Sequence, residues 1–109
     1  MDTQVDNHID PSSVFEVSET LKLISDPTRI KILWALLHGE HSVNGLSEHV
    51  GAQPPAVSQH LAKLRIAGLV SVKREGNKML YSSSNRYVQN IIEQALLSTN
   101  KEQKEHHNG

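Results

Sequence analysis

Cysteine is absent from the 109-residue sequence, which excludes disulfide bonds, thiolate metal ligands and a cysteine nucleophile. Long apolar runs are absent too, since none approaches the roughly 20 residues that span a bilayer. The first residues, MDTQVDNHIDPSS, have neither the basic nor the apolar region of a secretory signal. We therefore expect a cytoplasmic protein with no membrane partner.

The motifs of common enzyme classes are also missing. The sequence has no glycine-rich phosphate loop, no His-Glu-x-x-His motif and no nucleophile elbow. Its acidic residues concentrate towards the N-terminus instead of pairing on a scaffold. These absences argue against an enzyme and favour a binding protein.

Net charge is nearly absent, at −1, but it is unevenly distributed. Residues 1–26 hold one lysine against six acidic residues, whereas residues 51–80 hold five basic residues against Glu75. The second segment therefore carries a net charge of +4 in a chain that is otherwise acidic or neutral. A basic cluster of this kind is typical of a nucleic-acid interface.

The apolar pattern predicts a mainly α-helical α+β fold with the element order ααααββα. Helical spacing of apolar residues, capping residues and a glycine-containing turn supply the boundaries. The predicted elements are helices over residues 14–25 and 27–37, a short helix between Ser42 and Gly51, a helix from Pro54, a hairpin over residues 69–82 and a helix over about residues 85–99.

One folded domain and two tails are expected from the composition. Residues 1–12 are polar and acidic and predict a flexible tail, which ends where Ser12 or Ser13 could cap the first helix. Residues 13–99 predict one domain of modest size. Residues 100–109 predict a second flexible tail, rich in charged residues.

The third and fourth predicted helices are joined by about three residues, which is the layout of a helix-turn-helix, and the hairpin after them would form a wing. Glutamine can read adenine, while serine and basic side chains can contact base edges or phosphates. The predicted DNA contacts are Gln53, Pro55, Ala56, Ser58, Gln59, His60, Lys63 and Arg65 on the fourth helix, and Lys73, Arg74 and Lys78 on the wing.

Four segments resemble the ArsR/SmtB family of bacterial winged-helix repressors: SDPTRIKIL, SVNGLSEHVG, PPAVSQHLAKLRIAGLV and KREGNKMLYS. The resemblance covers about residues 14–98 and is specific, because these segments and Tyr81 follow the family's order and spacing. It implies a winged helix-turn-helix repressor that occupies double-stranded operator DNA and leaves it when an effector binds. A winged helix that binds a protein instead of DNA, through its acidic N-terminal tail, is the alternative.

The resemblance also implies a homodimer built on the first and last helices. The apolar stripes of these helices agree with it, because a single chain of this size has difficulty burying them. The predicted interface residues are Val14, Val17, Leu21, Ile24, Val88, Ile91, Ile92 and Ala95.

The sequence leaves the identity of the effector open. The nearest resemblance is to the nickel- and cobalt-sensing branch, but Asn85, Tyr87, Ser98 and Lys101 occupy the positions of its usual last-helix ligands. A nickel, cobalt or zinc site in the tails, a different signal, or no effector at all remain as alternatives. The candidate metal ligands in the tails are His8, Glu105, His106 and His107.

The remaining histidines and the single tryptophan are expected to be structural. His38 and His41 flank a loop that should be solvated, and His49 lies where it can interact with a helix dipole. Trp34 is expected in the core.

Overall fold

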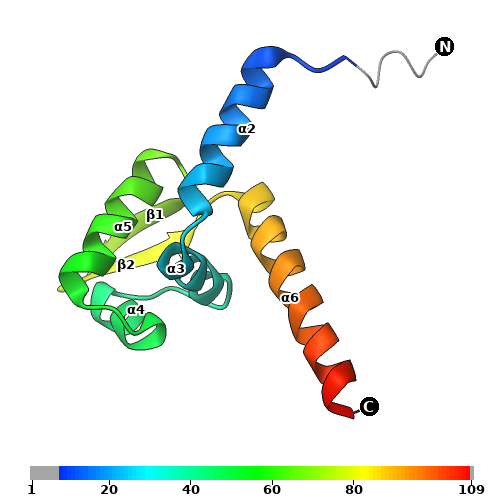
Figure 1. The fold of residues 1–109 in the computed structure, drawn as a ribbon. Helices are drawn as coiled ribbons and strands as arrows, with labels where there is room; N and C mark the ends of the chain where they lie inside the picture. Colours follow the sequence, from blue (N-terminus) through cyan, green and yellow to red (C-terminus); the bar gives the residue numbers. More distant parts are fainter. Residues whose placement is uncertain (1–7, 109) are drawn as a thin grey trace.

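Five helices and one hairpin follow one another in the computed structural model, which describes residues 8–108 (Figure 1). The order ααααββα and the winged helix-turn-helix class are therefore confirmed. Among the described residues, no helix combines the length and apolar character of a membrane span. The elements are α2 (Pro11–Ile24), α3 (Pro27–Leu37), α4 (Val43–Val50), α5 (Pro54–Ile66), β1 (Val70–Glu75), β2 (Lys78–Ser83) and α6 (Arg86–Asn108).

The predicted capping residues of α3 and α4 are confirmed. Asp26 accepts a hydrogen bond from the Arg29 backbone N–H at 3.0 Å, and Ser42 accepts one from the Gly45 N–H at 3.1 Å. Gly51 ends α4 in the left-handed conformation, with φ of 70°. These side-chain caps satisfy amide groups that have no partner within the helix.

The outer ends of α2 and α6 differ from the predictions. Helix α2 begins at Pro11 and is capped by Asp10, not by Ser12 or Ser13, because an aspartate followed by proline also makes a favourable helix start. Helix α6 continues to Asn108 beyond the predicted end near Thr99. Lysine, glutamate and glutamine are good helix formers, and no glycine or proline interrupts residues 100–108.

The core lies between α3, α4, α5, the hairpin and the first half of α6, while α2 and the far end of α6 project from this body (Figure 1). Three predicted interface residues, Ile24, Val88 and Ile92, belong to this core and are buried within the single chain, so they expose little surface to a partner. They pack against the chain's own body, where α2 and α6 meet it. The buried residues are Ile24, Ile32, Leu33, Leu36, Leu46, Val50, Val57, Leu61, Leu64, Leu69, Val70, Val88 and Ile92.

The hairpin is antiparallel and pairs Val70 with Ser83 at one end and Glu75 with Lys78 at the other. Gly76 occupies the two-residue turn with φ of 64°, a conformation that glycine adopts without steric cost. The loop before α4 joins this sheet, since His41 and Tyr81 exchange backbone hydrogen bonds of 3.1 and 2.8 Å. The loop is therefore tied to the wing.

The environment of the His41 ring makes folding stability dependent on pH. Partial burial lowers the pKa of His41 from its ordinary value, and the charge of His49 lowers it further. The two rings meet edge to face with centroids 4.6 Å apart.

We predict that the folded chain loses stability as the pH falls from about 7 to about 5, because the unfolded chain then binds a proton at His41 more readily than the folded chain does. His41→Gln should flatten this dependence, since the backbone bonds to Tyr81 remain. Melting temperatures of both proteins across this pH range measure the difference. Parallel curves would contradict the assignment to His41.

Candidate nucleic-acid interface

The turn between α4 and α5 is closed by local contacts. Gly51 reverses the chain, and the Ser47 hydroxyl donates a hydrogen bond to the Ala52 carbonyl. After the turn, α5 inserts Val57, Leu61 and Leu64 into the core. Because one side of α5 is fully buried, its opposite side must face outwards.

The outward side of α5 carries most of the predicted DNA contacts. Small and amide side chains occupy its first half, and two basic side chains occupy its last turn, where they also suit the helix dipole. All of these residues are exposed: Gln53, Pro55, Ala56, Ser58, Gln59, Lys63 and Arg65.

His60 differs from the other predicted contacts. It is half-buried, and its Nδ1 accepts a hydrogen bond of 3.0 Å from Arg29 Nε. The ring is therefore held against α3 and has a structural partner within the chain. The sequence suggested no such partner, because Arg29 and His60 belong to different helices far apart in the chain.

Arg29 connects three helices through one side chain. Its Nη1 donates to the Leu23 carbonyl at the end of α2 at 2.8 Å, while its Nε donates to His60 on α5. Its backbone N–H donates to Asp26 and is the main cause of the lowered pKa of that carboxyl group. The position of α5 relative to α2 and α3 therefore depends on this residue.

The hairpin presents Lys73, Arg74 and Lys78, all of them exposed. Lys73 is already paired, since its Nζ lies 3.2 Å from a carboxylate oxygen of Glu40. The hydrogen bond and charge of Glu40 raise the pKa of Lys73. Arg74 and Lys78 form no salt bridge with any residue between 8 and 99, so they are the more available cations of the wing.

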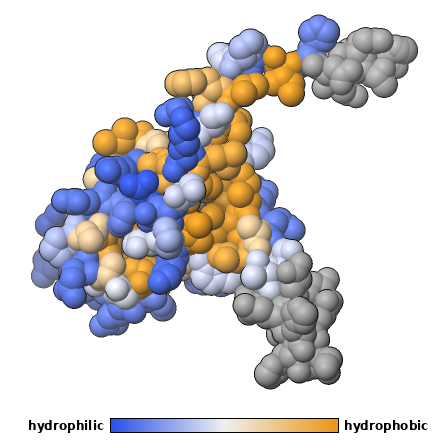
Figure 2. Space-filling view, viewed as in Figure 1, coloured by the Kyte–Doolittle hydropathy of each residue, from blue (hydrophilic) through white to orange (hydrophobic). Residues whose placement is uncertain are grey.

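A second surface is apolar and lies on the projecting helices. Figure 2 shows apolar side chains along α2 and over the region where it meets the body. The predicted interface residues Val14, Val17, Leu21, Ile91 and Ala95 are exposed there or on α6. Four further apolar residues are exposed and were not predicted from the sequence. Phe15, Tyr87 and Leu97 lie on the same helices, and Ile9 precedes α2.

The predicted metal site in the tails is not tested. Among the residues with described side chains, no group of three or more His, Asp or Glu side chains is arranged to hold a metal ion. The side chains of Glu105, His106 and His107 lie outside that description, while His8 is exposed before α2. The tail site stays a prediction.

A closed turn between α4 and α5, an exposed face on α5 and a following hairpin define a winged helix-turn-helix protein. A family model described as "Bacterial regulatory protein, arsR family" matches residues 26–72. The chain is 35% identical over 85 residues to the transcriptional repressor SdpR of Bacillus subtilis, covering 78% of this chain and 94% of SdpR. The chain belongs to the ArsR family, as the sequence resemblance predicted.

Two further similarities agree with this membership. The regulator KmtR of Mycobacterium tuberculosis is 43% identical over 82 residues, which cover 75% of this chain but only 63% of KmtR. The crystal structure of NolR from Sinorhizobium fredii superposes with a TM-score of 0.72 at 33% identity, covering 81% of this chain and 91% of NolR. The chain therefore spans less than two thirds of KmtR and most of NolR.

We predict that Arg29→Met lowers the free energy of unfolding by about 1–3 kcal/mol, because the partly buried Leu23 carbonyl and His60 ring both lose their donor. Urea unfolding followed by circular dichroism measures the change. Lys31→Met is the matched control on the exposed side of α3 and should change stability by about 0.5 kcal/mol or less. Equal losses in the two variants would contradict a special role for Arg29.

Proposed function

We propose that this chain is a homodimeric transcriptional repressor that binds operator DNA in the bacterial cytoplasm and leaves it when an effector binds. The observation that carries the proposal is the exposed face of α5, which combines amide, small and basic side chains on the second helix of a helix-turn-helix. Membership of the ArsR family and the name of SdpR, a transcriptional repressor, support it. The proposal assigns no catalytic activity to the chain.

In this proposal, the first half of α5 reads bases in the major groove. Gln59 can form two hydrogen bonds with adenine, while Ser58 contacts a base edge or a phosphate. Lys63 and Arg65 in the last turn bind phosphates and set the position of the helix. Small side chains at Pro55 and Ala56 allow the helix to approach the groove floor closely.

The wing then adds contacts outside the major groove. Arg74 and Lys78 are the main candidates for flanking phosphates, since Lys73 is paired with Glu40. Electrostatic contacts of this kind do not distinguish sequences, but they strengthen binding to all DNA and make it sensitive to salt. His60 is left out of the proposed contacts because it binds Arg29.

The apolar surface of α2 and α6 is proposed as the dimer interface. Val14, Val17 and Phe15 are each at least half exposed on α2, which a single chain in water does not favour. Joining two such faces about a twofold axis buries both and pairs two recognition helices. Two copies of α5 spaced about 34 Å apart, one helical turn of DNA, would enter two successive turns of the major groove on the same face of the duplex.

We predict that Gln59→Ala and Lys78→Ala weaken DNA binding in different ways. Gln59→Ala should weaken binding to the operator by about 1–3 kcal/mol, the value of one bidentate contact with a base, and should have little effect on binding to random DNA. Lys78→Ala should weaken both duplexes alike and reduce the salt slope by about one per phosphate contact.

Fluorescence anisotropy measures both effects, with a fragment of the chain's own promoter, a shuffled duplex and a series of salt concentrations. Equal losses from both variants on both duplexes would contradict this division of roles. A winged helix that recognises a protein need not bind either duplex at low salt, so this experiment also tests the alternative class.

We predict that Val17→Glu converts the dimer into a monomer, because a carboxylate in an apolar interface is left without a partner. Analytical ultracentrifugation of the wild-type and variant chains measures the mass directly. Ile66→Glu is the control, since Ile66 is 88% exposed at the end of α5 and belongs to neither of the two helices of the proposed interface. A dimer in both variants would show that α2 does not form the interface.

A further inference from the structure

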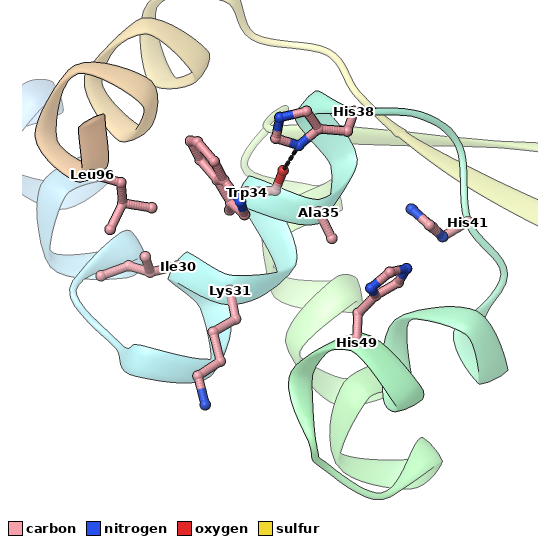
Figure 3. Close-up of a pocket in the computed structure, with 8 residues that line it drawn as sticks. All are labelled: Ile30, Lys31, Trp34, Ala35, His38, His41, His49 and Leu96. Carbon is pink, nitrogen blue, oxygen red and sulfur yellow. Dashed lines mark hydrogen bonds between the residues drawn. The ribbon is translucent and has the colours of Figure 1, made fainter. Parts of the chain in front are cut away.

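A cavity with a volume of about 520 Å³ lies between α3, α4 and α6 (Figure 3). This volume falls within the range of about 300–1,000 Å³ typical of small-molecule sites. None of the residues that line it is a proposed DNA contact or a proposed dimer-interface residue. Its lining residues are Ile30, Lys31, Trp34, Ala35, His38, His41, His49 and Leu96.

One part of the cavity is apolar and partly preformed. Trp34 and Leu96 come from different helices and face the same space, with Ile30 beside them (Figure 3). Trp34 is only partly buried, so the expectation that it is a core residue is too simple. His38 holds this wall, because its ring meets Trp34 edge to face at 4.8 Å and its Nδ1 lies 3.0 Å from the Trp34 carbonyl oxygen.

The rest of the lining consists of side chains that can donate hydrogen bonds or carry positive charge. The amine of Lys31 forms no salt bridge with any residue between 8 and 99. His41 and His49, from the loop and from α4, meet edge to face, while the flexible side chain of Lys31 extends away from them (Figure 3). No carboxylate lines the cavity, so this group of cationic and imidazole side chains has no negative partner there.

The chemistry of the lining favours an organic anion over a metal ion. A metal would need a further His, Asp or Glu beside the His41 and His49 rings, and the described residues offer no group of three such ligands. An anion, in contrast, gains from Lys31 and from both imidazoles. The indole of Trp34 offers a flat apolar surface on which an aromatic ring can pack.

We propose that this cavity binds a small aromatic carboxylate and that this binding changes DNA affinity. The change in DNA affinity rests on the proposed function. The ring would pack between Trp34 and Leu96, and the carboxylate would bind His41, His49 and the amine of Lys31, whose flexible side chain turns towards it. The ligand would contact α4, which begins the helix-turn-helix, and α6, which carries part of the apolar surface. A single bound ligand would thereby connect the helix-turn-helix with the apolar surface of α6.

The single tryptophan of the chain makes the binding step directly measurable, since Trp34 lines the cavity. Titration of the full chain with 3-phenylpropanoate should produce a saturable change in Trp34 emission. The neutral amide, 3-phenylpropanamide, should bind about tenfold more weakly because it cannot form the charged hydrogen bonds. Acetate, which lacks the ring, should produce no saturable change at the same concentrations.

Lys31→Met should weaken 3-phenylpropanoate binding by about tenfold, since it keeps the aliphatic stem but loses the charge. Lys22→Met is the matched control, because Lys22 is an exposed lysine on α2 that does not line the cavity. Urea unfolding of both variants shows that a loss of binding does not come from a loss of folding. His49→Gln, on another element, should also weaken the carboxylate and leave the amide unchanged.

Anisotropy with the promoter fragment, with and without 3-phenylpropanoate, measures the coupling. A changed DNA affinity in the wild type that is lost in Lys31→Met would support the proposal. Absence of a saturable signal, equal binding of acid and amide, or a response to nickel or zinc alone would overturn the site. Carboxylate binding without a change in DNA affinity would overturn the effector role, whereas carboxylate binding by a chain that binds no DNA would instead refute the proposed function.

Discussion

The contacts of Arg29 join α5 to α2 and α3 and help to fix where α5 lies. A guanidinium group has several donors in fixed directions, so it can hold a backbone carbonyl of α2 and an imidazole of α5 at the same time. The capped start of α3 keeps Arg29 itself in position, because Asp26 accepts its backbone N–H. The three helices therefore meet at one polar point beside an otherwise apolar core.

The two exposed surfaces follow from this arrangement. Once α5 buries Val57, Leu61 and Leu64, its amide and basic side chains have no place except the outside. Likewise, α2 reaches the core only near its end, through Leu23 and Ile24, and leaves its earlier apolar side chains on the surface. The polar face of α5 suits nucleic acid and the apolar face of α2 suits a second protein chain.

Local chemistry made the order of helices and strands predictable, whereas contacts between residues distant in the sequence could not be predicted. Asp26, Ser42 and Gly51 act within a few residues of their own position, so the sequence showed where α3 and α4 begin and where α4 ends. Periodicity identified the apolar side of α6, but it could not show that Ile92 is already buried within the single chain. The exposed residues of α5 were predictable because they lie between the buried ones at helical spacing. The pairs Lys73–Glu40 and Arg29–His60 join separate elements and needed the fold.

The same limit applies to the cavity, since its histidines come from a loop and a helix that the sequence treats separately. Its position matters because a ligand shifts an equilibrium only when it binds two conformations with different affinity. Helix α4 packs against α5, and the Ser47–Ala52 hydrogen bond closes the turn between them. A ligand that holds His49 of α4 at a set distance from Leu96 of α6 therefore also sets the distance between α5 and the apolar surface of α6. In a dimer joined through that surface, this distance determines the separation of the two recognition helices, and operator DNA is sensitive to that separation.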